Sequence, residues 1–335
     1  MSIGRFLRLS AHLQMLPILE GGEETLIGGQ AVMEGVMMLA PHSCCIAVRK
    51  PDGEIVTEER PVQKVADRYP IFRYPILRGL GRIGQTMALG SKALKYSFNQ
   101  ALAAEAASQT NAEATSDTKK PTEVNSWMMT GSLIFSVAIF LFLYKFVPLF
   151  LATNLGHAVP MLSSRFAINM TDGAIRIAIF LTYLMVLSRP KDIQRVFQYH
   201  GAEHKVVFNY ESGKPLSVET AQKFTTFHPR CGTCFLLVML VIATVVYALL
   251  PVDGFLAKFA LRIACLPLIV GLSYELIRFA ARRQGTLLGM LTAPGLWLQR
   301  ITTKPPDDTQ AAIAIHALKG AMALEAKQGG ELVVA

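Results

Sequence analysis

The chain of 335 residues is long enough for two soluble domains, but its composition indicates a membrane protein. Hydrophobic residues make up 52% of it, charged residues only 17%, and the mean hydropathy is +0.37. The net charge of +9 has an ordinary explanation, because Lys and Arg collect in the cytoplasmic segments of membrane proteins. We recognise no nucleic-acid-binding motif and expect no nucleic-acid partner. The five cysteines do not form the pattern of a disulfide framework.

The first 102 residues predict a small α+β region. An Asp-Gly pair lies between two β-rich runs, Cys44–Arg49 and Glu54–Glu59, and predicts a β-hairpin. Glu34 lies in a glycine-flanked segment before it, where a salt bridge is the ordinary role of a carboxylate and a role at a site is the alternative. A basic amphipathic helix within Tyr69–Leu102 would either lie on anionic lipid headgroups or pack on the hairpin.

Four apolar runs after this region predict transmembrane helices. A polar segment at residues 103–125, which we expect to be a flexible linker, precedes them. Two helices fall within residues 126–189 and two within residues 232–280, and a helical tail follows at residues 281–335. The second run is short and is the weakest of the four. The runs are Met128–Ala152, Gly173–Ser188, Gly232–Leu250 and Phe255–Ala280.

The distribution of Lys and Arg predicts the orientation of these helices. Residues 1–125 hold fourteen, the loop at 190–231 holds six and residues 278–335 hold seven, whereas the 153–172 connection holds one. We therefore expect both termini and the 190–231 loop in the cytoplasm, and the lipid bilayer as a partner. The expected fold class is mainly α: a polytopic membrane protein with about four transmembrane helices and a small cytoplasmic α+β region.

The 190–231 loop contains two clusters of residue types that bind metals. His200, Glu203 and His204 form an H-x-x-E-H pattern, which on a helix places both imidazoles on one face with a carboxylate beside them. Gly201 costs a helix about 1 kcal/mol relative to Ala, but it would let a substrate or a second backbone approach closely. The loop before the third predicted span supplies three further candidate ligands, namely His228, Cys231 and Cys234.

The predicted topology adds Glu275 to the candidate ligands. The fourth span returns to the cytoplasmic side, which places Glu275 about one turn from its end and level with Cys231. A carboxylate within a span is costly without a partner or a task. Arg278 is the ordinary partner, and a metal or a substrate is the alternative.

Four strings in this sequence resemble a known family. They are GGQAVMEGVMM at Gly28–Met38, YHGAEHK at Tyr199–Lys205, HPRCGT at His228–Thr233 and PGLWLQ at Pro294–Gln299. The chain thereby resembles the YqhQ-like family of bacterial polytopic membrane proteins, a group of unknown function described as predicted metal-dependent enzymes. The resemblance implies a protein of the bacterial inner membrane and names no substrate. In that family a serine stands more often than a cysteine at Cys234, which ranks it last among the candidate ligands.

Two functions of different classes fit these residues, and we favour an enzyme. In a membrane-facing hydrolase, both helical histidines and one of His228, Cys231 or Glu275 would hold a divalent metal, with Zn²⁺ expected. Glu203 would be the general base, and the substrate would be lipid-linked or membrane-proximal. In a non-enzymatic scaffold or assembly factor, the helical histidines with Cys231 and Cys234 would close a structural site. A transporter is a third option that would require oligomerisation, because the spans hold few polar residues.

Overall fold

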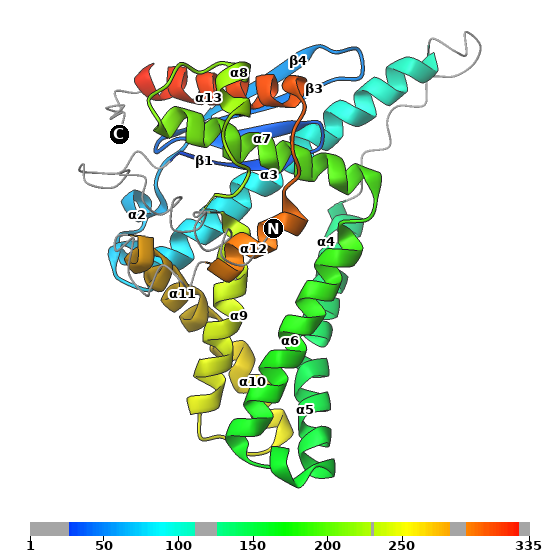
Figure 1. Ribbon diagram of the computed structural model, residues 1–335, viewed down its shortest axis with the longest axis vertical. Helices are drawn as coiled ribbons and strands as arrows, with labels where there is room; N and C mark the ends of the chain where they lie inside the picture. The colour runs from blue at the N-terminus through cyan, green and yellow to red at the C-terminus, as the bar shows by residue number, and fades with distance from the viewer. Residues whose placement is uncertain (1–26, 111–125, 229–230, 282–292, 328–335) are drawn as a thin grey trace.

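The computed structural model describes residues 27–110, 126–228, 231–281 and 293–327. Within these ranges the chain is mainly helical and contains one four-stranded antiparallel sheet near its N-terminus. The sheet and the helices on its two faces form a three-layer α/β/α unit, from which a group of long apolar helices extends (Figure 1).

The sheet is a meander whose strands pair in chain order. The predicted hairpin is confirmed as its second half, with Arg49 paired opposite Ile55. The first half consists of two strands that we had not predicted. The second to fifth residues of its second strand are apolar and the strand is buried on both faces, so it lacks the alternation that marks a half-exposed strand. The strands are β1 (Gly28–Val32), β2 (Gly35–Leu39), β3 (Ser43–Arg49) and β4 (Ile55–Pro61).

Side chains of the central strands alternate between two cores, one on each face of the sheet. Helices α7 (Lys191–Glu211) and α13 (Asp308–Lys327) cover the first core, which contains Val36, Met38, Cys45 and Ala47. Helix α3 (Leu77–Thr110) covers the second, which contains Met37, Cys44, Ile46 and Val48. The N-terminal strands, the helix of the 190–231 loop and the C-terminal helix therefore share one unit.

Helix α3 has one of the two roles expected of the basic amphipathic segment. It packs on the hairpin through Leu89, Ala93 and Tyr96. The helix continues to Thr110, into the segment for which we had predicted no structure. The rest of that segment, residues 111–125, lies outside the described residues.

A buried carboxylate joins the C-terminal helix to the sheet. Glu325 accepts hydrogen bonds from Oγ of Ser43 at 2.7 Å and from the backbone N–H of His42 at 2.9 Å. Burial of this carboxyl would raise its pKa, but the hydrogen bonds from Ser43 and His42 outweigh that effect and hold the pKa of Glu325 below its ordinary value.

Three stretches of described helix are long and apolar enough to cross a membrane, and a bent helix pair makes a fourth. The second stretch is 23 residues long and therefore longer than the run that we had predicted. Its first turns contain polar residues, which a membrane helix can hold because they are buried and hydrogen-bonded to other helices. The fourth is bent by 50°, and Pro267, which lacks a backbone donor, lies just after the bend. These stretches are built from α4 (Ser126–Leu141), η2 (Phe142–Phe146), α5 (Val147–Ala158), α6 (Arg165–Leu187), α9 (Gly232–Leu249), α10 (Phe255–Ala264) and α11 (Leu266–Ala281).

Shorter elements complete the described chain. Helix α12 (Ala293–Thr302) packs beside α9 and leaves Trp297 exposed. The others are α2 (Val65–Arg68), η1 (Pro70–Arg73), η3 (Pro160–Leu162) and α8 (Val218–Gln222).

Candidate metal centre

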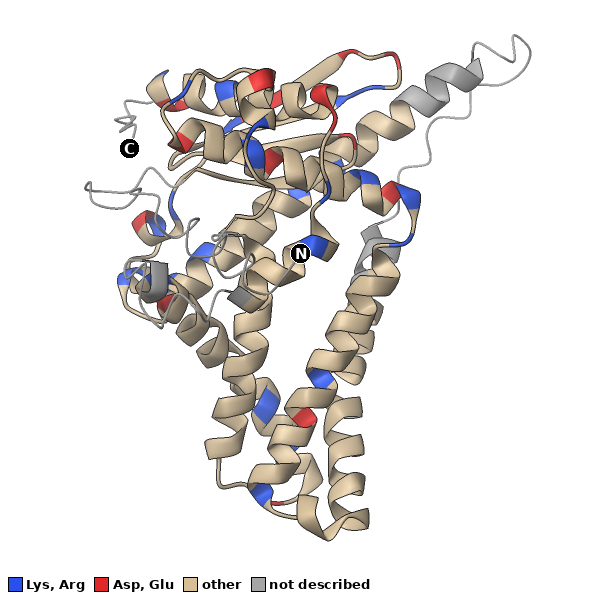
Figure 2. Ribbon diagram, viewed as in Figure 1, with Lys and Arg blue, Asp and Glu red and all other residues tan. Residues whose placement is uncertain are grey.

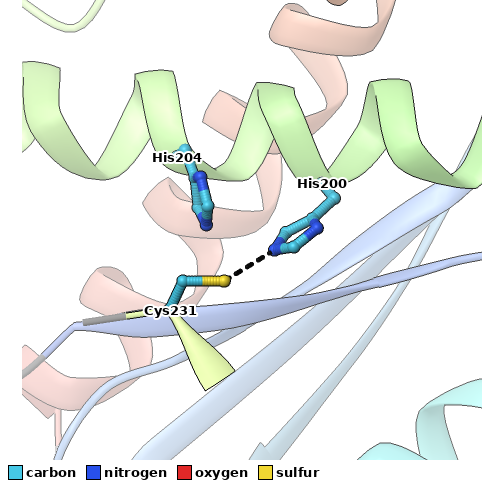
Figure 3. A group of neighbouring side chains, drawn as sticks. All are labelled: His200, His204 and Cys231. Atoms are coloured by element: carbon cyan, nitrogen blue, oxygen red, sulfur yellow. Dashed lines mark hydrogen bonds between the residues drawn. The ribbon is translucent and has the colours of Figure 1, made fainter. Parts of the chain in front are cut away.

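Three side chains from two distant parts of the chain converge beneath α7 (Figure 3). His200 and His204 lie one turn apart on that helix, with ring centroids separated by 4.5 Å. Cys231 caps the N-terminus of α9, and its sulfur lies 3.3 Å from Nε2 of His200. One ligand-type atom from each residue lies within 4.8 Å of the other two. This spacing suits a single ion bound by all three side chains.

Backbone carbonyl oxygens fix the tautomer of both histidines. Nδ1 of His200 lies 2.8 Å from the carbonyl oxygen of Thr302, and Nδ1 of His204 lies 2.5 Å from that of Thr226. A carbonyl oxygen only accepts, so each Nδ1 carries the proton and each Nε2 keeps a lone pair for a metal. Burial also lowers the pKa of His204, which favours the neutral imidazole that metal binding requires.

A glycine on α7 allows a second backbone to reach this site. The N–H of Lys304 donates to the carbonyl oxygen of Phe197 at 2.9 Å, so the segment after α12 crosses the helix. A Cβ at Gly201 would lie 2.0 Å from the carbonyl oxygen of Lys304. The prediction that Gly201 admits a second backbone is confirmed, and the crossing brings the carbonyl of Thr302 to His200.

Glu203 is buried beside Nε2 of His204, the nitrogen that keeps a lone pair. Its Oε2 lies 3.4 Å from Nε2 of His204. Its Cγ rests on β1 at Gly29, where an added Cβ would lie 2.6 Å from that carbon. The glycine in the first strand thus makes room for the carboxylate, and it connects the GGQAVMEG string to the H-x-x-E-H helix.

His228 and Cys234 are held by a buried amide and lie outside the converging group. Gln299 on α12 accepts from the backbone N–H of His228 at 2.7 Å and donates to its carbonyl oxygen at 2.7 Å. The same amide donates to the sulfur of Cys234 at 3.0 Å. Nε2 of His228 lies 3.6 Å from Oε2 of Glu211, and burial lowers the pKa of His228 to about 4. Gln299 was not among the predicted site residues, although it ends the PGLWLQ string as its single polar side chain.

The remaining two carboxylates are in ion pairs. Glu275 on α11 pairs with Arg78 of α3, with Nε 2.5 Å from Oε1, and accepts from the N–H of Ile76 at 3.3 Å. Its partner is therefore Arg78 and not Arg278, a pairing across the fold that no sequence spacing indicates. Glu34 pairs with two arginines of the α/β/α unit, at Arg49 and Arg195. It has the ordinary role expected of it.

The fold and this site define a mainly helical protein with several candidate membrane helices and a His/Cys group suited to a metal ion. The family described as "Protein of unknown function (DUF1385)" matches residues 74–324, and the chain belongs to this family. It is 33% identical over 301 residues to the uncharacterized protein YqhQ of Bacillus subtilis (strain 168), which covers 89% of this chain and 93% of that protein. The resemblance to the YqhQ-like family is thereby confirmed. No solved structure matches the chain.

Proposed function

We propose that the protein is a membrane-bound, zinc-dependent hydrolase whose site lies where the α/β/α unit meets the candidate spans. The observation that carries the proposal is the convergence of His200, His204 and Cys231 with Glu203 beside them. Two imidazole nitrogens and one thiolate are donors that Zn²⁺ prefers, and three protein ligands leave one position for water. Catalytic zinc sites keep such a position open, whereas structural sites close it.

The placement of Cys234 supports the enzyme over a structural site. A scaffold with a closed site needs a fourth protein ligand, and Cys234 was the candidate. Its sulfur accepts a hydrogen bond from Gln299 and does not belong to the converging group. The fourth position is therefore more easily assigned to water than to this thiol.

The chemistry proposed for the site is general-base hydrolysis. A zinc ion held there would supply the Lewis acidity that brings the pKa of water towards neutrality. Glu203 accepts the proton of the attacking water and passes it to the leaving group. The carbonyls of Thr302 and Thr226 keep both imidazoles in the orientation and tautomer that ligation needs.

The surroundings of the site support a substrate that is lipid-linked or membrane-proximal. Cys231 is the residue from which the candidate span α9 begins, and Gln299 ties the same loop to α12. Trp297 on α12 is 45% exposed, and tryptophan is enriched at the membrane–water interface. The Lys and Arg distribution supports a bacterial plasma-membrane protein with this site and both termini on the cytoplasmic side.

Metal content and hydrolysis, measured together on the full chain in detergent, test the proposal. The wild type should hold about one zinc per chain and cleave a member of a panel of lipid-linked esters and amides. Glu203→Gln should keep the zinc and lose the hydrolysis, because an amide does not accept the proton at neutral pH. His200→Ala and His204→Ala should lose the zinc, whereas His316→Ala, at an exposed position on α13, serves as the matched control and keeps both.

Two results would contradict the proposal, and they bear on different parts of it. Full hydrolysis by Glu203→Gln would remove the general-base mechanism while leaving a metal site. Unchanged zinc content in both His200→Ala and His204→Ala would remove the metal site itself. A silent Glu203→Gln combined with unfolding of the histidine variants is the outcome that the scaffold predicts.

A further inference from the structure

Three cations and one carboxylate are buried together among the candidate spans. Lys145 of η2, Arg176 of α6 and Arg262 of α10 are each at most 4% exposed, and Asp172 of α6 is fully buried. Figure 2 shows how few charged positions interrupt the helical extension in which they lie. Ionisable residues at such positions are costly and usually have a function.

Each oxygen of the Asp172 carboxylate pairs with one of the two arginines. Arg262 donates from Nη1 to Oδ1 of Asp172 at 2.5 Å, and Arg176 pairs with the other oxygen of the same group. Lys145 donates to the hydroxyl of Tyr247 at 2.9 Å and pairs with no carboxylate among the described residues. The cluster therefore carries a surplus of positive charge. Because a guanidinium does not lose its proton in proteins, a surplus persists even if the lysine is neutral.

An aromatic ring only partly compensates for this surplus. Nζ of Lys145 and Cζ of Arg176 lie 5.2 Å from the ring centroid of Tyr247, and Cζ of Arg262 lies 5.0 Å from it. A single ring shared by three cations offsets only part of the cost of burying them among apolar helices. In addition, Nη1 of Arg176 is buried and has no hydrogen-bond partner in the described part of the chain.

The helices are irregular where they carry Lys145 and Arg262, and a pocket opens beside Arg262. Lys145 lies in a π-helical turn, and Arg262 lies in the last turn of α10 before the 50° bend. Such breaks in membrane helices are tolerated where they line a site, and π-turns are frequent at functional sites. The pocket has three aliphatic side chains and four polar ones in its lining, the latter being Asn169, Tyr247, Lys258 and Arg262.

We propose that this cationic cluster binds a phosphate group, supplied by an anionic membrane lipid or by inorganic phosphate. Guanidinium and ammonium groups are the donors that recognise phosphate, and one phosphate charge would offset the surplus next to Arg262 and Lys145. The site rests on the proposed membrane insertion but not on the metal. Tyr247 lies sixteen residues along α9 from Cys231, which is about 24 Å of helix.

Thermal unfolding of the full chain in phosphate-free detergent solution tests this site. Inorganic phosphate and phosphatidylglycerol are titrated separately, with phosphatidylcholine as the uncharged-headgroup control. Lys145→Met keeps the length of the side chain and removes one cation, so its half-saturating anion concentration should rise about tenfold. Its melting temperature without anion should exceed that of the wild type, because one uncompensated buried charge is gone. Arg165→Gln is the matched control, since Arg165 forms an exposed pair with Asp253 near the same end of α6.

Each outcome bears on the proposal directly. Stabilisation by phosphatidylglycerol alone identifies a lipid as the source of the phosphate group, and stabilisation by inorganic phosphate identifies a free anion. The proposal is overturned if neither probe raises the melting temperature of the wild type, or if Lys145→Met and Arg165→Gln respond alike. Zinc content is measured in the same samples and should be equal in all three proteins, so failure here is distinct from failure of the hydrolase.

Discussion

Replacing Gly201 with alanine adds one methyl group at the point where two backbones cross beside the candidate metal centre. The added Cβ would lie 2.0 Å from the carbonyl oxygen of Lys304, and real Cβ contacts essentially never fall below 3.0 Å. The crossing segment must therefore move by about 1 Å. Thr302 is two residues earlier in that segment, and its carbonyl holds the ring of His200.

The packing cost outweighs the gain in helix propensity. Alanine is better than glycine within a helix by about 1 kcal/mol. Overpacking costs about 1–3 kcal/mol, and the weakened hydrogen bond to His200 adds about 1 kcal/mol. We expect Gly201→Ala to lower the free energy of unfolding by about 1–3 kcal/mol. Zinc affinity should fall about tenfold or more, because the hydrogen bond that orients His200 is weakened.

Thermal unfolding and zinc titration of the full chain measure both effects. Gly84→Ala on α3 is the matched control, because nothing lies within 4 Å of a Cβ added there. That variant should be slightly more stable than the wild type and bind zinc equally well. If Gly201→Ala behaves like Gly84→Ala in both measurements, the crossing does not orient His200 and the reasoning is refuted.

Three further predictions concern the α/β/α unit, the orientation of the candidate spans in the membrane, and the ion pair that connects helix α3 to the candidate spans. The pKa of Glu325 is lowered, so its stabilisation is present above the ordinary carboxyl pKa and is lost as the pH falls through the folded value. Glu325→Gln should thus cost about 1–3 kcal/mol at pH 7. Its melting temperature should approach that of the wild type only as the pH falls below the ordinary carboxyl pKa of about 4.3; a constant difference would contradict this. Met161 is 84% exposed, and a cysteine in its place should react with an impermeant maleimide in intact cells. Lys223→Cys should react only after the cells are permeabilised; labelling of Lys223→Cys alone in intact cells would contradict the predicted orientation. Arg78→Gln should lower the melting temperature by leaving Glu275 without its ion-pair partner, and adding Glu275→Gln should restore most of the loss; a double variant as unstable as the single one would argue against the pair.

The sequence predicted the elements whose patterns are local. The Asp-Gly turn placed the hairpin, and the apolar period placed the C-terminal helix, because both signals lie within a few residues of the structure that they form. β2 was missed because both of its faces are buried, which removes the alternation. The start of α6 was missed because Asp172 interrupts the apolar run at its N-terminal end, and its ion pair with Arg262 of α10 is visible only in the fold.

The candidate site was predictable in part for the same reason. The helical spacing of His200 and His204 is sufficient to place two ligands together. The choice between Cys231 and Cys234 depends on how the loop enters α9 and on where Gln299 lies, 65 residues further along the chain. No spacing rule carries that information. For the same reason, the sequence did not indicate that Glu275 pairs with Arg78 and not with Arg278.

The coordination of zinc in the loaded, full-length protein tests the central claim most directly. X-ray absorption at the zinc edge counts the sulfur and the nitrogen or oxygen ligands. We predict one sulfur at about 2.3 Å and three nitrogen or oxygen atoms at about 2.0–2.1 Å. The sulfur should be absent in Cys231→Ser and present in Cys234→Ser. Two sulfurs in the wild type would place Cys234 on the ion and make the site structural, and a protein that binds no zinc would contradict the account altogether.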